Sequence, residues 1–359
     1  MWDEGDAQSG GDGQAAQERA LTTFLDDLDP ESRDLLLSVA RPVSHPAGAT
    51  LVRHGDPARG AFVLRQGGVE AVVTLPGGES LVVAKLGAGA VFGEMALVEQ
   101  GTCTATVRAS AAVEGWFIAH EDFRALVARN DPAAIRLQHA VTLILAEKLA
   151  ALNAQLLACP APEDLPARTN VAGVDPLAGL PRVASLPFEA RAFLPKLPFF
   201  DHFTEDEIDA VLAYAAFVEV PRGGGVFAAG TPPAAAFVVV RGAAEVLAMQ
   251  AGRERRIAVV GPGQLIGFLG VLRERAHSSF AFARESSVLL EIPGPAFREL
   301  YFGPGRASTR LRAAVQRSLL ASMGRTNRAL TRLLSQARLH ASRDEKPLEA
   351  ALAGQLTSV

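Results

Sequence analysis

Two segments of the chain repeat at almost the same spacing. Residues 61–67 (AFVLRQG) return 175 positions later as residues 236–242 (AFVVVRG). Residues 87–93 (GAGAVFG) return 174 positions later as residues 261–267 (GPGQLIG). Because the two offsets agree to within one residue, the chain is predicted to contain two copies of one fold. A period this long indicates duplicated domains rather than a solenoid.

Both copies have the same predicted order of elements. A helix opens each copy, since Asp29-Pro30 is typical of an N-cap followed by N1, and Thr204 with Glu207 is typical of a capping box. Short β-rich runs between Gly and Pro follow, as in a roll or barrel. These runs are 50–53, 61–64, 69–74 and 80–85 in the first copy, and 226–228, 236–240, 244–249 and 256–260 in the second. Apolar residues at three-to-four spacing predict closing helices over 131–157 and about 307–339.

The predicted fold class is therefore mainly β with flanking helices. Two domains, 20–157 and 191–340, are joined by a Pro-rich linker over 158–190. Residues 1–19 are expected to form a disordered acidic tail and residues 341–359 a flexible tail.

Charge is distributed unevenly along the chain. The net charge is only −4, but residues 1–34 contain ten acids and two arginines. Residues 305–342 contain eight arginines and no acid. The two cysteines are too few for a disulfide framework and fit a reducing compartment. With an acidic, polar N-terminus and apolar runs far shorter than about 20 residues, we expect a cytoplasmic protein without a membrane span.

Residues 92–97 (FGEMAL) and 101–109 (GTCTATVRA) carry the functional signal. They resemble the phosphate-binding cassette of the cyclic nucleotide-binding domain, the family of protein kinase A regulatory subunits and the bacterial catabolite activator protein. The family pattern is approximately F-G-E-L-A-L, a short turn and then P-R-x-A-T-V. The resemblance covers about 20–157 and 191–340, and it implies two tandem β-rolls of jelly-roll type, each closed by a C-terminal helix.

The resemblance implies a role for two residues of the family pattern: the Glu binds the ribose 2′-hydroxyl, and the Arg pairs with the cyclic phosphate. The first copy keeps the Gly and the Glu but has Thr-Cys in place of Pro-Arg. It is therefore expected to bind a cyclic nucleotide such as cAMP weakly or not at all. Its candidate ligand residues are Gly93, Glu94, Met95, Ala96, Thr102, Cys103 and Thr104.

The second copy departs further from the family pattern. A Phe replaces the ribose-binding Glu and a His replaces the Arg, so this pocket is expected to be degenerate. Its candidate residues are Gly267, Phe268, Leu269, His277 and Ser278. Alternative interpretations stay open: Glu94 as a helix N-terminal acid, Cys103 as a buried hydrophobe or a redox sensor, and His277 as a structural residue.

Nothing in the sequence indicates catalysis. The histidines show no metal-ligand spacing, and no nucleophile-elbow or P-loop signature occurs. We expect a regulatory or sensor protein with no enzymatic activity and no cofactor, acting through protein partners. The alternatives are a pure scaffold with both pockets inactive and a nucleic-acid-associated regulator.

The closing helix of the second copy carries an apolar stripe together with the basic residues. It is expected to mediate homodimerisation; the alternatives are binding to nucleic acid, to an anionic surface or to an acidic partner. The stripe comprises Leu311, Val315, Leu319, Met323, Leu330 and Leu334.

Overall fold

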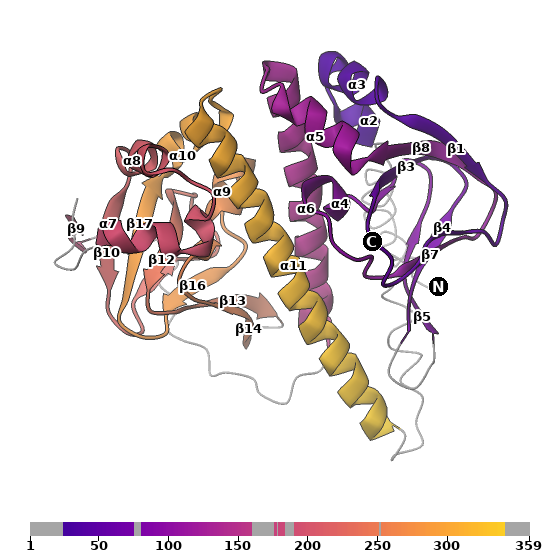
Figure 1. Ribbon diagram of the computed structural model, residues 1–359. Helices are drawn as coiled ribbons and strands as arrows, with labels where there is room; N and C mark the ends of the chain where they lie inside the picture. The colour runs from indigo at the N-terminus through magenta and orange to yellow at the C-terminus, as the bar shows by residue number, and fades with distance from the viewer. Residues whose placement is uncertain are drawn as a thin grey trace, which may run out of the picture. The chain divides into compact units, whose positions relative to one another are not determined.

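The computed structural model describes residues 24–74, 80–159, 176, 177, 179–183, 190–250 and 253–341. The predicted acidic tail 1–19, the end of the chain after 341 and most of the linker lie outside these residues. The chain divides into two compact units, Thr142–Leu334 and the remainder, so the two boundaries fall within the long helices Pro132–Ala158 and Arg306–Ala341 (Figure 1).

The first unit contains two antiparallel four-stranded sheets, with strand orders β1-β8-β3-β6 and β2-β7-β4-β5. The elements are α2 (Phe24–Asp27), α3 (Pro30–Leu37), β1 (Arg41–His45), β2 (Thr50–Val52), β3 (Gly60–Gln66), β4 (Val69–Thr74), β5 (Ser80–Leu86), β6 (Val91–Phe92), α4 (Met95–Val98), β7 (Thr106–Ala109), β8 (Val113–Ala119), α5 (His120–Ala128) and α6 (Pro132–Ala158), whose second half belongs to the other unit.

The second unit repeats this topology. Its sheets have the orders β15-β12-β17-β10-β9 and β11-β16-β13-β14. The elements are β9 (Arg182–Val183), α7 (Ala190–Phe193), η1 (Leu194–Lys196), η2 (Pro198–Phe200), α8 (Glu205–Leu212), β10 (Ala216–Val220), β11 (Gly225–Phe227), β12 (Ala235–Arg241), β13 (Ala244–Gln250), β14 (Arg253–Val260), β15 (Leu265–Ile266), α9 (Phe268–Arg273), β16 (Phe280–Ala283), β17 (Ser287–Pro293), α10 (Gly294–Phe302) and α11 (Arg306–Ala341). The prediction of two tandem β-rolls flanked by helices is confirmed.

Both predicted helix starts are present. The Asp29 carboxylate accepts a hydrogen bond from the Ser32 backbone N–H, and Pro30 is the first helical residue. The Thr204 hydroxyl accepts from the Glu207 N–H while the Glu207 carboxylate accepts from the Thr204 N–H, which is the capping box. Each cap satisfies backbone donors that the helix leaves unpaired.

Apolar side chains from the two sheets of each unit meet in a single core. In the first unit Leu64 and Phe92 from one sheet pack with Val107 from the other. In the second unit the equivalent cluster is larger, and it includes Leu177 from the predicted linker. Arg182 of the same segment forms an ion pair with Glu291 at 2.8 Å. Part of the predicted linker therefore packs on the second unit.

Within the second unit, the last part of α6 packs along α11. The hydroxyl of Thr142 accepts hydrogen bonds from the Tyr301 hydroxyl at 3.0 Å and from Nε2 of Gln316 at 3.1 Å. Further along, Leu156 and Leu330 share a buried cluster.

The apolar stripe of α11 is covered inside the chain. Leu311, Val315 and Leu319 are fully buried at 0% exposure. Met323 and Leu330 are also buried, and the side chain of Leu334 lies outside the described residues. The stripe therefore has intramolecular partners, and self-association through it stays a prediction.

Helix α6 bears on the expectation that the chain has no membrane span. It has 27 residues, and an 18-residue window within it has a mean hydropathy of 1.4, so it is long and apolar enough to cross a membrane by length and composition alone. The expectation from the sequence considered only uninterrupted apolar runs, and the absence of a membrane span stays a prediction. Leu145 and Ala146 are buried, and the buried hydroxyl of Thr142 is hydrogen-bonded within the protein. About a third of the apolar window is buried within the protein, and one such helix is weak evidence for a membrane span.

Candidate functional site

A tight turn at Gly93 opens the cassette of the first unit. Gly93 has a φ of +74°, in the left-handed region. A Cβ atom at this position would lie 2.7 Å from the carbonyl oxygen of Gly60 on β3. Only glycine satisfies both the backbone conformation and the close approach.

Glu94 follows this turn and is buried at 4% exposure. Helix α4 begins at the next residue, and the Glu94 side chain makes no capping hydrogen bond to it. The structure therefore leaves both interpretations of Glu94 open, as a ligand residue and as a helix N-terminal acid.

The backbone of Ala96 is engaged within the protein. Its N–H donates to the carbonyl oxygen of Gly93 at 3.0 Å. Its carbonyl oxygen is in hydrogen-bonding contact with Nδ1 of His120, which is buried at the start of α5. The cassette helix is therefore connected directly to the helix that follows the roll. Met95, the other predicted backbone donor, is half-buried.

The resemblance in the sequence placed Cys103 at the position of the family arginine. Its N–H donates to the carbonyl oxygen of Asp56 at 2.8 Å, and its carbonyl oxygen accepts from the Gly55 N–H at 2.9 Å. In the second unit His277 makes the same pair of bonds, donating to Thr231 at 3.0 Å and accepting from Gly230 at 2.8 Å. Cys103 and His277 are therefore structurally equivalent, as the repeat predicts.

Among the residues that the structure describes, the charged group that acts on the Cys103 thiol is Asp56. Burial and the negative charge of Asp56 raise the pKa of the Cys103 thiol. A raised pKa leaves little reactive thiolate, so the interpretation of Cys103 as a redox sensor is disfavoured. Arg108, the next arginine on this strand, is exposed, whereas its neighbours Val107 and Ala109 are in the core. Because strand residues alternate between faces, Arg108 lies on the face of β7 opposite the core.

The threonines of the cassette have different surroundings. Thr102 and Thr104 are exposed, and Thr102 forms an isolated antiparallel bridge with Pro57. The Thr106 hydroxyl accepts a hydrogen bond from the His54 N–H at 3.1 Å.

The second cassette is filled by side chains of its own unit. The ring of Phe227, on β11, stacks on the imidazole of His277 with centroids 4.2 Å apart. The same ring lies 3.5 Å from where a Cβ of Gly267 would be, so it covers the cassette turn. Phe268, at the position of the family Glu, is buried at 5% exposure. Leu269 is half-buried and Ser278 is exposed.

Equivalent positions differ between the two rolls. Val52 corresponds to Phe227 and Phe62 to Phe237, at the offset of 175. Val52, Phe62 and Cys103 are half-buried, whereas their counterparts in the second unit are buried. The inner wall of the first roll is therefore accessible where that of the second is packed.

Two segments of the chain, residues 42–130 and 217–303, match the family model of the cyclic nucleotide-binding domain. The chain carries two cyclic nucleotide-binding domains in tandem. The matched segments contain the two cassettes described above, so the resemblance seen in the sequence is confirmed for both copies.

Relatives of these domains occur in proteins of different kinds. The chain is 31% identical over 129 residues to the cyclic AMP receptor protein of Thermus thermophilus, a match covering 36% of this chain and 58% of that protein. It is 34% identical over 139 residues to glutaminase 1 of Bradyrhizobium diazoefficiens, covering 39% of this chain and 22% of that protein. Among solved structures, the regulatory domain of Toxoplasma gondii PKA with cAMP is 17% identical, with a TM-score of 0.29, over 89% of this chain and 98% of that one. The chain spans less than two thirds of either curated relative.

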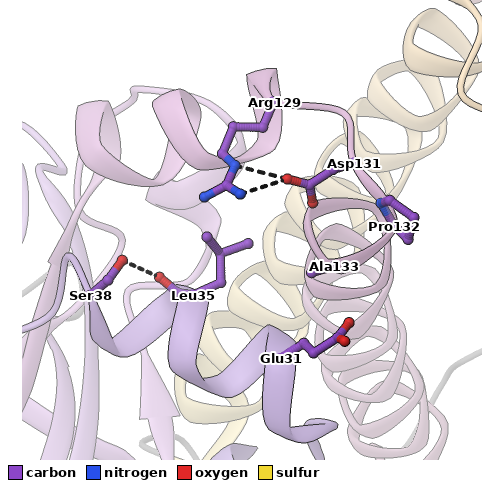
Figure 2. A pocket seen from close by; sticks show the side chains of 7 residues that line it. All are labelled: Glu31, Leu35, Ser38, Arg129, Asp131, Pro132 and Ala133. Atoms are coloured by element: carbon purple, nitrogen blue, oxygen red, sulfur yellow. Dashed lines mark hydrogen bonds and ion pairs between the residues drawn. The ribbon is translucent and has the colours of Figure 1, made fainter.

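A separate depression in the first unit lies away from the first cyclic nucleotide-binding cassette. It has a volume of about 500 Å³ and lies between α3 and the junction of α5 and α6 (Figure 2). Its charged side chains are paired: Arg129 with Asp131 at 2.8 Å and Glu31 with Arg136 at 2.6 Å. The Glu31–Arg136 pair connects the opening helix to the closing helix of the domain, whereas Arg129 and Asp131 pair within the junction of α5 and α6. We assign both pairs a structural role.

Sequence reasoning missed three residues of the two cassettes: Asp56, His120 and Phe227. Asp56 and Phe227 lie outside the cassette motifs, in segments preceding them. The repeat nevertheless gave a signal for Phe227, because it makes Phe227 the equivalent of Val52 in the first copy. Nothing local in the sequence indicated that His120 contacts the cassette helix.

Proposed function

We propose that this chain is a non-catalytic regulatory protein whose first domain responds to a small ligand and whose second domain is permanently closed. The observation that carries the proposal is a difference between the two cassettes. In the second, the rings of Phe227 and His277 stack on each other and are buried, whereas the equivalent residues of the first, Val52 and Cys103, are half-buried. A pocket filled by its own side chains has no room for a ligand of nucleotide size.

The first cassette contacts the helix that follows the roll. His120 contacts the carbonyl oxygen of Ala96 on α4 and begins α5. A ligand that shifts α4 therefore alters the start of α5 and, through it, the approach to α6. We propose that this shift changes the surface presented to a protein partner, and that the protein acts in the cytoplasm.

The runner-up is a pure scaffold in which both pockets are inactive. The features that favour the sensor are the intact Gly93 turn and the buried Glu94.

A nucleic-acid role for α11 is weakened by its arginines. Arg312 is buried, at 1% exposure, and donates to the carbonyl oxygens of Tyr301 and Gly303. Arg310 lies 3.5 Å from the Glu207 carboxylate. The basic composition of this helix therefore serves internal contacts in part.

A thermal-shift screen of the full chain tests the proposal, because a ligand that binds only the native state raises the melting temperature. The probes are cAMP, cGMP, cyclic dinucleotides, adenosine and guanosine. We expect a shift for at least one probe in the wild type, lost in Glu94→Gln and retained in Glu99→Gln. Glu99 is the matched control because it is exposed at the end of the same helix. No shift with any probe would favour the scaffold.

A further inference from the structure

We propose that the second domain carries a docking site for a short extended peptide, and that residues 176–183 of the same chain, here called the strap, occupy it. A partner segment with the same pattern of side chains competes with the strap for this site. The structure describes all of the strap except residue 178. Three contacts hold it: a strand pairing, a buried leucine and an ion pair. The proposal is independent of whether the first cassette binds a ligand.

The strap adds a strand to the edge of a sheet. Strand β9 runs antiparallel to β10, with Val183 opposite Phe217 and Arg182 opposite Val218. An edge strand presents backbone N–H and C=O groups that a further extended segment can pair with. Addition of a strand to such an edge is a common mode of peptide recognition, in which side-chain pockets supply the specificity.

A leucine and a proline anchor the start of the strap. Leu177 is buried at 1% exposure in the apolar cluster between the two sheets. Pro176 lies against the start of β11, where a Cβ atom on Gly225 would come within 2.6 Å of the Pro176 Cβ. Glycine at this position therefore leaves the room that the strap occupies.

An arginine fixes both the shape of the strap and its attachment to the domain. Nε and Nη2 of Arg182 donate to the two carboxylate oxygens of Glu291, at 2.8 Å and 3.3 Å. Nη1 donates to the carbonyl oxygens of Leu177 and Leu180, at 2.9 Å and 3.1 Å. A bidentate arginine–carboxylate pair is directional and specific. The site therefore selects an extended segment with a leucine five positions before an arginine.

The first domain provides an internal comparison, because it has the same strands without these features. Strand β1 corresponds to β10, and its register against β8 is that of β10 against β17. Among the strands that the structure describes, β1 lies at the edge of its sheet. Three positions that receive the strap differ at the repeat offsets: Gly225 is Thr50, Phe217 is Pro42, and Glu291 is Phe117. The first domain thus has an added Cβ, a strand residue without an N–H and no carboxylate, so the docking site belongs to the second domain.

The strap has few contacts for an element of a folded core. Strand β9 is two residues long, and the side chains of Arg182 and Glu291 are 34% and 14% exposed. Short, partly exposed elements of this kind open at low free energy. Attachment to the same chain keeps the site filled, because it gives the strap a high effective concentration. A free peptide should therefore compete poorly with the intact strap and well with a weakened one.

Fluorescence polarisation tests the proposal with a labelled peptide of residues 176–183 (PLAGLPRV) and the full chain. The peptide should bind the variant Arg182→Glu at least about tenfold more tightly than wild type, because the substitution weakens the competing strap. Adding Glu291→Gln to that variant should weaken peptide binding by about tenfold or more. Adding Glu285→Gln, at an exposed position shortly before β17, should leave it unchanged. A peptide with Leu177→Asp and Arg182→Glu should not bind.

Other results would overturn the proposal. If the peptide binds neither wild type nor Arg182→Glu while both melt cooperatively, the strap is a fixed part of the core. Equal binding to both proteins, insensitive to Glu291→Gln, would place the peptide elsewhere. Should Arg182→Glu fail to melt cooperatively, Arg182→Gln removes the ion pair more mildly, and the same direction is expected.

Discussion

The ring of Phe227 stacks on the imidazole of His277 with their planes 19° from parallel. This contact fills the space that corresponds to the accessible wall of the first domain. Phe227→Ala should destabilise the protein by about 3–5 kcal/mol, since it removes a buried aromatic ring and leaves a cavity. Denaturant unfolding measures this. Phe193→Ala is the control, because Phe193 is 39% exposed and its loss should cost little. Equal effects of the two changes would show that the ring does not fill the cassette.

His277 should make stability depend on pH. Burial lowers the pKa of His277 below its ordinary value, so the unfolded state binds the proton more readily than the folded state. Stability is therefore present above the ordinary histidine pKa and is lost as the pH falls through it toward the lower folded pKa. Unfolding free energies measured between about pH 7.5 and about pH 5.5 should decline more in wild type than in His277→Gln. Parallel pH profiles for the two proteins would contradict this.

Thr142 joins α6 to the second domain through two buried hydrogen bonds. Both Tyr301 and Gln316 donate to its hydroxyl, and burial raises the pKa of Tyr301 to about 12. Thr142→Val keeps the shape but removes the acceptor, and it should cost about 1–3 kcal/mol in chemical denaturation. Thr142→Ser should recover most of the loss because it keeps the hydroxyl. If serine and valine behave alike, packing rather than hydrogen bonding holds this contact.

Arg312 caps the end of α10 from inside the protein. It donates to Tyr301 O at 2.7 Å and to Gly303 O at 2.9 Å. Arg312→Met fills the volume but leaves these carbonyl oxygens unsatisfied, and it should lower the unfolding free energy by about 1–3 kcal/mol. Arg328→Met on the exposed face of the same helix should change it by less than about 0.5 kcal/mol. A comparable effect of both would mean that Arg312 contributes only its charge.

Much of this fold was predictable from the sequence repeat. The two offsets placed equivalent strands, and the backbone bonds of Cys103 and His277 match the alignment residue by residue. Several strands, among them β1, β8 and β17, were absent from the predicted runs. For β1 the reason is that its sequence, RPVSH, is polar and largely exposed. The apolar periodicity predicted the stripe of α11. It could not predict which residues cover that stripe, because contacts such as that between Leu330 and Leu156 join residues far apart in the chain.

The cassettes were predictable only in part. The motif located Glu94 and the missing arginine at Cys103, because both lie in a contiguous pattern. The stacking of Phe227 on His277 in the second pocket was not predictable, because Phe227 lies on a strand 50 residues before His277. Asp56 was missed for the same reason: the loop that places it beside Cys103 is distant in sequence.

Hydrogen–deuterium exchange of the full chain, with and without saturating adenosine or guanosine, tests most directly whether only the first domain is a ligand site. Bound ligand should slow amide exchange in residues 93–106 and at the start of α5, because it orders the cassette and the His120 contact. Exchange in residues 267–281 should not change, since Phe227 and His277 occupy that cassette. Protection of the second cassette, or of neither cassette by a probe that calorimetry shows to bind, would contradict the account.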